Sequence, residues 1–247
     1  MKQAMIFAAG LGTRLKPLTD TMPKALVRVG GEPLLRHVIL RLKDAGFERI
    51  VVNVHHFAQQ IIDYLSANYN FGLDIRISDE REMLLDTGGG IKKALPLFDD
   101  ASPILIHNVD ILSNVDLAAF YSQAVRGDCE ASLLVSKRPT SRYLLFNQQS
   151  MLVGWTNIKT GEVKSPWPSL NPAGLDHFAF SGIHVIAPSL FACFQEMPDK
   201  FGIVDFYLKY CENHPLKGFL KDDLQLLDVG KLDTLEQAEL FLNEVKE

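Results

Sequence analysis

MIFAAGLGTRLKPLTDTMPKAL, residues 5–26, decides the fold, because an apolar run passes directly into a glycine loop. The run Gln3–Ala9 is short, apolar and bounded by glycine, which predicts a buried strand. Gly10 and Gly12 allow a ligand to approach the backbone closely, and successive backbone N–H groups can cradle an anion. The stretch therefore predicts a strand that delivers an anion-binding loop to the carboxyl edge of a sheet, where open α/β sheets bind their ligands.

The loop matches neither of two common phosphate-binding motifs. A dinucleotide-binding G-x-G-x-x-G motif requires a third glycine where Leu15 stands, and Pro17 interrupts the helix that should follow. The P-loop pattern G-x-x-x-x-G-K-[ST] is absent from the sequence. Arg14 and Lys24 add the positive charge that a polyphosphate requires. The loop therefore predicts a phosphate site of a third kind.

Strand and helix patterns alternate through the first half of the chain. Arg49–Val54 is apolar and β-branched, as a buried parallel strand should be, and residues 31–46 form an amphipathic helix that ends at a glycine. Beyond Lys137 the pattern changes to shorter strands, with residues 142–147 and 151–157 predicted as a hairpin. We therefore predict an α/β fold with a Rossmann-like, doubly wound mixed sheet, parallel in its first half with antiparallel additions in its second half.

The later helices and loops follow from the same patterns. We expect a helix over residues 89–98, a surface loop over residues 164–174 and a closing helix over residues 233–246. No internal repeat or Gly/Ser linker interrupts the sequence. The chain is therefore expected to form a single domain, residues 1–247.

Bulk composition excludes several classes of protein. The 247 residues are 47% hydrophobic and 22% charged, which is ordinary for a globular protein, and the net charge of −5 argues against a general nucleic-acid surface. No apolar run approaches the roughly 20 residues of a membrane span. Cys129, Cys193 and Cys211 are far apart and lack zinc-site spacing. We therefore expect a cytoplasmic protein with reduced cysteines and no nucleic-acid or membrane partner.

AAGLGTRLKPLTDTMPKALVRVGGEPLL, residues 8–35, resembles the opening of the sugar-1-phosphate nucleotidyltransferases, or NDP-sugar pyrophosphorylases. The segments DTGGG…ALP and FSGI…PSLF look most like the short bacterial N-acetylmuramate, mannose and heptose 1-phosphate nucleotidyltransferases. The resemblance implies the nucleotide-diphospho-sugar transferase type of sheet. It also implies a nucleotide-binding half at about residues 1–136 and a sugar-phosphate-binding half at about residues 137–247.

The resemblance assigns roles within the opening loop. Arg14 would stabilise the β- and γ-phosphates as pyrophosphate leaves, and Lys24 would offset charge at the α-phosphate. Such roles suit phosphoryl-type transfer, in which positioning and charge stabilisation dominate. The backbone expected to hold the phosphates of the nucleotide is that of Ala9, Gly10, Gly12 and Thr13.

Two aspartates are candidates for binding a metal. Asp110 and Asp228 each end an apolar strand, and Mg²⁺ prefers carboxylate oxygens together with phosphate oxygens. Matching aspartates hold the metal in the family, so the resemblance implies Mg²⁺ as cofactor. Val109 stands where the family usually has glycine, and a β-branched residue there is expected to crowd the path of the substrate.

The remaining candidate residues follow from the resemblance. Gly88 and Gly89 match a turn that faces the nucleobase and ribose, where glycine allows close approach. On the acceptor side, the family places a glycine on the strand that includes residues 178–186, and a sugar-phosphate pocket needs a cation. The residues expected to bind the sugar phosphate are Asn108, Arg142, Ser181 and Gly182.

The resemblance implies a transferase of nucleotide-sugar biosynthesis, of the kind that supplies cell-envelope polysaccharide. Its substrates would be an NTP, with UTP preferred, and a sugar 1-phosphate. Two alternatives stay open: a GTP-using mannose or heptose 1-phosphate guanylyltransferase, and a non-catalytic nucleotide-sugar-binding regulatory protein motivated by Val109. A glycosyltransferase would carry D-x-D at the metal strand, whereas Ile111 and Leu112 follow Asp110. The sequence leaves open whether the protein is a monomer or a homo-oligomer.

Overall fold

The computed structural model describes residues 1–244. Its strands are β1 (Gln3–Phe7), β2 (Arg28–Val29), β3 (Glu32–Pro33), β4 (Arg49–Val54), β5 (Asp74–Asp79), β6 (Ile104–Asn108), β7 (Ile111–Ser113), β8 (Ala131–Ser136), β9 (Arg142–Phe146), β10 (Leu152–Asn157), β11 (Glu162–Lys164), β12 (Asp176–Ile186), β13 (Leu216–Leu220) and β14 (Leu226–Asp228). Its α-helices are α1 (Leu34–Asp44), α2 (Ala58–Ala67), α3 (Asp86–Ala94), α4 (Leu117–Arg126), α5 (Phe191–Gln195), α6 (Ile203–Tyr210) and α7 (Asp233–Glu244).

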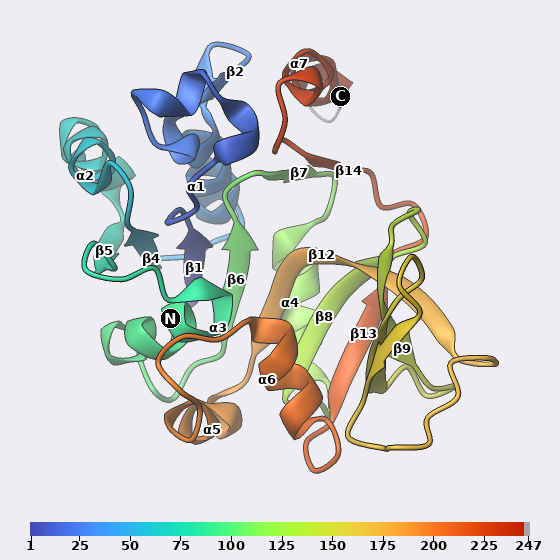
Figure 1. Cartoon of the computed structure of the whole chain (residues 1–247). Coiled ribbons are helices and arrows are strands. Elements are labelled where there is room, and N and C mark those ends of the chain that lie inside the picture. The colour runs from blue at the N-terminus through green and yellow to red at the C-terminus, as the bar shows by residue number, and fades with distance from the viewer. Residues whose placement is uncertain (245–247) are drawn as a thin grey trace.

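One large mixed sheet runs through both halves of the chain. Its main path has the order β11-β10-β9-β12-β6-β1-β4-β5, and β8 and β13 extend it from β12. The strands β1, β4, β5 and β6 are parallel, whereas β12 joins β6 in the antiparallel direction. Figure 1 shows β1 and β6 side by side, both pointing toward the loops that follow β1. This arrangement confirms the predicted fold class.

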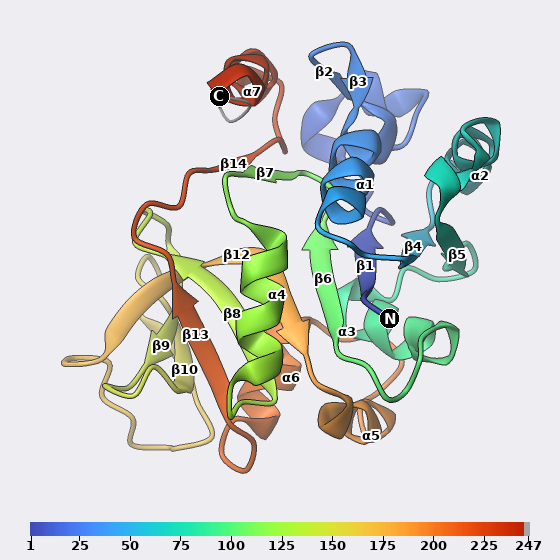
Figure 2. The ribbon, with the colours of Figure 1, turned by 180° about the vertical axis from the view of Figure 1, so that it is seen from behind.

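Helices cover both faces of the parallel strands. Helices α3, α5 and α6 lie toward the viewer in Figure 1, and α1 and α4 lie on the opposite face in Figure 2. The alternation of β1 explains the two layers, because Ala4 and Ile6 enter the core beneath α1 and α4 while Met5 enters the other core. Within the described residues, no helix combines the length and the apolar character needed to cross a membrane.

Two local features differ from what the sequence predicts. Helix α3 begins at Asp86 rather than at residue 89, so the three glycines lie within its first turns. The strand β7 was not predicted, because three residues are too short to show a periodic pattern; it pairs with β14 apart from the main sheet. The predicted closing helix is described as far as Glu244, and its last two predicted residues lie outside the described range.

Two buried histidines make the stability of the fold depend on pH. Burial lowers the pKa of His107 on β6 and of His184 on β12 to about 3 each, from 6.5. The unfolded chain therefore takes up protons at a higher pH than the native chain, so stability is present above the unfolded pKa and is lost as pH falls below it. We expect the free energy of unfolding to fall by about 1 kcal/mol per histidine between about pH 7 and about pH 5.5.

Urea titrations at the two pH values test this expectation. The substitution His107→Leu removes one titrating group, so its pH-dependent loss should be about half that of the parent protein. The exposed His56 offers the control, since His56→Gln should leave the pH dependence unchanged. A pH dependence that is the same in all three proteins would contradict the assignment.

Candidate active site

A cleft of about 430 Å³ lies at the carboxyl edge of the parallel strands. Its walls come from the ends of β1, β4, β5 and β6 and from the first turn of α3, with Lys24 and Lys200 contributed by two loops. Of the predicted site residues, it brings together Ala9, Gly10, Lys24, Asn108 and Asp110. A cleft at this edge is where the sheet topology favours ligand binding.

The glycine loop presents free backbone donors beside this cleft. Asn53, buried on β4, accepts hydrogen bonds through Oδ1 from the N–H groups of Ala8 at 2.7 Å and Ala9 at 3.3 Å. The next N–H groups, those of residues 10–13, donate to no group in the part of the chain that the structure describes. Gly12 has a φ of 63°, in the left-handed region. A run of free N–H groups with such a turn can bind an anion.

Substitutions at Gly10 and Gly12 can separate an effect on ligand binding from an effect on folding. A Cβ on Gly10 would meet no described atom within 4 Å, whereas a Cβ on Gly12 would lie 2.9 Å from Cγ2 of Thr19. We expect Gly10→Ala to keep the melting temperature and to weaken binding of the NTP that the sequence predicts about 10-fold, because the added methyl group would face the open space of the predicted anion site. Gly12→Ala should instead lower the melting temperature. Thermal unfolding and NTP titration of both variants check the prediction; wild-type affinity in Gly10→Ala would contradict it.

Lys24 and Asp110 form an ion pair in the cleft. Lys24 Nζ donates to Asp110 Oδ2, and the two side chains are only 11% and 18% exposed. Lys24 begins the short helical turn Lys24–Leu26, which follows the glycine loop in the chain, and Asp110 lies two residues after the end of β6. The pair brings the predicted cation and the predicted metal ligand to one point beside the free N–H groups.

Backbone pairing brings Asp228 close to Asp110. The strand β14 pairs with β7 so that Asp228 stands opposite Ile111, and the N–H of Val229 donates to the carbonyl of Asp110 at 2.8 Å. Gly230 explains how Arg14 reaches the same place, because a Cβ there would lie 2.6 Å from both Arg14 Nη2 and Asp228 Oδ1. Arg14 and Asp228 therefore gather at the same edge as the cleft, although neither lines it.

The residues present fit a Mg²⁺ ion that is shared with a ligand. Within residues 1–244, no group of three or more histidine, cysteine or acidic side chains is arranged to hold a metal. The carboxylates of Asp110 and Asp228 would be the protein's ligands to such an ion, with the phosphates of a ligand completing the coordination. Mg²⁺ is commonly bound in this way, by one or two carboxylates together with substrate phosphates.

Val109 is accommodated without backbone strain. Its φ lies outside the left-handed region, and its N–H donates to the carbonyl of Phe7 at 3.2 Å. The side chain is 4% exposed and belongs to the hydrophobic core while also lining the cleft. A glycine is therefore not required at this position for conformational reasons.

The glycines of α3 make room for packing. A Cβ on Gly88 would lie 2.2 Å from the ring of Phe201, and one on Gly89 would lie 2.1 Å from the carbonyl oxygen of Asp199. Their N–H groups both donate to the carbonyl of Phe201. The residues of this turn that line the cleft are Asp86 and Thr87. Contact of Gly88 and Gly89 with a nucleotide stays a prediction, to which the structure adds a packing role.

A second pocket of about 360 Å³ contains the predicted Arg142. Ser181 and Gly182 lie between the two pockets and line neither. The hydroxyl of Ser181 accepts a hydrogen bond from the N–H of Ile183, and a Cβ on Gly182 would lie 2.5 Å from Asn108 Nδ2. Gly182, with a φ of 76°, therefore allows β12 to approach the residue that ends β6.

Sequence reasoning missed three residues of the first cleft. Asn53 Nδ2 donates to Glu80 Oε1 at 2.7 Å, and the N–H of Leu85 donates to Glu80 Oε2 at 3.2 Å. Burial raises the pKa of Glu80. The pair connects the glycine loop to the segment before α3, while Lys200 reaches the cleft from the loop before α6. The one sequence signal that could have marked Asn53 and Glu80 as residues of the cleft is their position near the ends of predicted strands.

Comparison with known proteins agrees with this geometry. Residues 3–245 match the family described as nucleotidyl transferase. Over 111 residues the chain is 50% identical to N-acetylmuramate alpha-1-phosphate uridylyltransferase of Caulobacter vibrioides, which covers 44% of this chain and 46% of that protein. The chain thus spans about half the length of the first curated relatives it matches.

Two further proteins are similar along nearly their whole length. D-glycero-alpha-D-manno-heptose 1-phosphate guanylyltransferase of Aneurinibacillus thermoaerophilus is 24% identical over 238 residues, 96% of each chain. HddC of Yersinia pseudotuberculosis, solved with GMP-PN, has the same fold, with a TM-score of 0.75 and 22% identity over 98% of this chain and 100% of that chain. The predicted resemblance is confirmed, and the chain belongs to the nucleotidyl transferase family.

Proposed function

We propose that this chain transfers a nucleotidyl group from an NTP to a sugar 1-phosphate in the presence of Mg²⁺, giving an NDP-sugar and pyrophosphate. The observation that carries the proposal is the run of free N–H groups at residues 10–13 beside the pair Lys24–Asp110. Such donors and charges suit a triphosphate. The family and the relatives named above as uridylyl- and guanylyltransferases support the reaction class.

The chemistry needs no protein nucleophile. A phosphate oxygen of the acceptor attacks the α-phosphorus in line, the bond from that phosphorus to the bridging oxygen of the β-phosphate breaks, and pyrophosphate leaves with the electron pair. The attacking phosphate is already anionic, so no general base has to remove a proton. Lys24 would stabilise the charge at the α-phosphate, and Arg14 would stabilise the departing pyrophosphate.

Asp110 and Asp228 would hold Mg²⁺ together with the phosphates of the nucleotide. When bound, the ion supplies charge neutralisation that allows two phosphate-bearing substrates to approach each other. The protein contributes the arrangement: the ion pair with Lys24 holds Asp110 in place, and the pairing of β14 with β7 holds Asp228 nearby.

Release of pyrophosphate tests the proposal. The purified chain is incubated with Mg²⁺ and each of five NTPs, paired with a panel of sugar 1-phosphates, and a parallel set receives EDTA. We expect release for at least one pair and none with EDTA. Nucleotide binding without release for every pair would support the regulatory alternative and contradict the transferase. Val109, which motivates that alternative, lines the cleft and adopts its conformation without a positive φ.

The preferred base is proposed to be uracil. The uridylyltransferase relative, at 50% identity, supports UTP, whereas the guanylyltransferase that matches 96% of the chain makes GTP the second candidate. Asp86 and Thr87 line the cleft at the turn that resembles a base site.

Thermal unfolding with Mg²⁺ and each NTP distinguishes the two candidates. A ligand that binds the native state raises the apparent stability by mass action, about 2.7 kcal/mol at a concentration 100 times its Kd. We expect UTP to give the largest increase in melting temperature. A larger increase with GTP would contradict the preference for UTP and leave the reaction class intact.

A further inference from the structure

The second pocket is strongly cationic. Arg138, Arg142 and Lys164 line it, and Asp205 is the one acidic residue among its described lining residues. The indole of Trp155 also lines the pocket and supplies an apolar face. This combination suits a ligand with a ring-shaped body and a negative charge.

The cations in this pocket are weakly engaged by the protein. Lys164 Nζ lies 3.8 Å from Glu162 Oε1 and 3.9 Å from Asp205 Oδ1. It also lies 5.3 Å from the centre of the Trp155 ring, and its side chain is about half exposed. Exposed contacts of this length contribute little. The guanidinium of Arg142 has no hydrogen-bond or ion-pair partner within residues 1–244, while Arg138 donates to the carbonyl of Phe180. Arg142 is therefore the group most free to meet a ligand.

Two short connections join this pocket to the nucleotide cleft. Asn108 of the cleft packs against Gly182, and Phe180, two residues earlier on β12, lines the second pocket. Two extended residues span at most about 7 Å. On the other wall, Thr87 Oγ1 of the cleft accepts a hydrogen bond from the N–H of Ile203, and the two residues after Ile203 line the second pocket. The two pockets are adjacent.

The cations of the second pocket are not needed to bind the reacting phosphate of the acceptor. In the proposed reaction that phosphate must reach the α-phosphorus near Lys24, inside the first cleft. Arg142 and Lys164 lie in the neighbouring pocket instead, so they face a different part of the acceptor. A neutral sugar gives such cations no partner.

We propose that the second pocket binds the sugar of the acceptor and that Arg142 pairs with a second anionic group on that sugar, in addition to its 1-phosphate. The proposal rests on the proposed function and narrows its substrate class to sugar 1-phosphates that carry a carboxylate or a further phosphate. Trp155 packs on the ring of the sugar, and Arg138 and Lys164 add to the positive field around the group.

Three acceptors with the preferred NTP test the proposal. N-acetylglucosamine 1-phosphate is neutral apart from its reacting group, N-acetylmuramate 1-phosphate adds a carboxylate, and glucose 1,6-bisphosphate adds a phosphate. We expect at least one anionic acceptor to exceed the neutral one in kcat/KM by roughly 10- to 100-fold, the worth of one charged hydrogen bond. Which of the two does so distinguishes a carboxylate from a phosphate.

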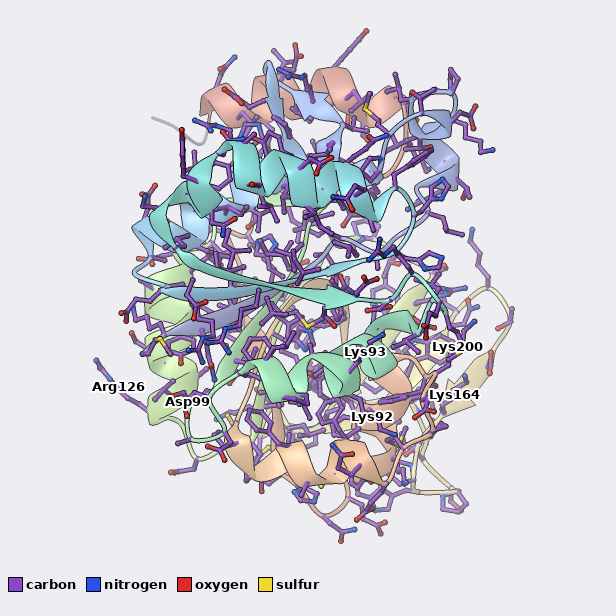
Figure 3. All side chains as sticks on the ribbon, turned by 90° about the vertical axis from the view of Figure 1, so that its left-hand side faces the viewer. Lys92, Lys93, Asp99, Arg126, Lys164 and Lys200 are labelled. Carbon is purple, nitrogen blue, oxygen red and sulfur yellow. The ribbon has the colours of Figure 1, made fainter. Side chains whose placement is uncertain are left out.

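The variant Arg142→Ala shows whether the pocket causes this preference. Its ratio of kcat/KM for the anionic over the neutral acceptor should fall close to one, and Arg142→Lys should restore part of it. The matched control is Arg126→Ala, because Arg126 on α4 lies on the opposite side of the molecule from Lys164 and Lys200 in Figure 3. That control should keep the wild-type ratio.

Three outcomes overturn the proposal. Equal efficiency with neutral and anionic acceptors, or an unchanged ratio in Arg142→Ala, would overturn the second anionic group and leave the transferase reaction standing. Absence of turnover with every acceptor and every NTP would overturn the proposed function, and this inference with it.

Discussion

Replacing Lys24 by alanine is expected to lower kcat by about 10²- to 10³-fold, the usual loss when one preorganised donor to a developing charge is removed. Lys24 is the cation of the first cleft that is both buried and held in place, through its pair with Asp110. It stands beside the free N–H groups of the glycine loop, where the α-phosphate is proposed to lie. Steady-state pyrophosphate release measures the effect.

A control separates this effect from a general loss of charge or of folding. Lys16 belongs to the same loop but is exposed and pairs with Asp20 on the surface, so Lys16→Ala should keep kcat within about twofold. The melting temperature of Lys24→Ala should be recorded alongside, because the variant leaves Asp110 without its partner. Full turnover in a folded Lys24→Ala protein would contradict the role of this lysine.

The second large effect is expected for Asp110→Asn. The amide keeps the shape of the side chain but removes the charge that both Lys24 and Mg²⁺ would meet, so kcat should fall by about 10²-fold or more. A second readout is the thermal shift with NTP: the part of the shift that depends on Mg²⁺ should disappear in the variant. Asp228→Asn should behave similarly.

Asp222 provides the comparison for both aspartates. It is an exposed carboxylate paired with Lys137 on the surface, and Asp222→Asn should keep both turnover and the Mg²⁺-dependent shift. If Asp110→Asn retained the Mg²⁺-dependent shift, the assignment of Asp110 to the metal would be wrong.

The parts of the fold that the sequence predicted are those with strong local patterns. The strand β4 has the predicted bounds, Arg49–Val54, because an uninterrupted β-branched run is unambiguous. The start of the helix Asp86–Ala94 was harder to predict, because glycine normally disfavours a helix. Glycine is needed at position 88 because the ring of Phe201, more than a hundred residues away in the chain, packs against it. Local propensity cannot reveal a partner at that distance.

Some residues of the candidate site could likewise be predicted from local sequence patterns, and others could not. Gly10, Lys24 and Asp110 were predictable because a continuous motif and the ends of strands mark them. Asn53 and Glu80 were not, because each acts through a hydrogen bond across neighbouring strands rather than through a motif. The second pocket could not be predicted either: the hairpin, β11 and α6 contribute its residues, and only the folded chain brings these segments together.

The close packing of Gly88 against the ring of Phe201 limits the order in which this chain can change during evolution. A side chain at position 88 would overlap the ring where it now lies, so it requires the ring to move or a smaller residue at position 201. The two sites are therefore epistatic, with a combined effect that is not the sum of the separate ones.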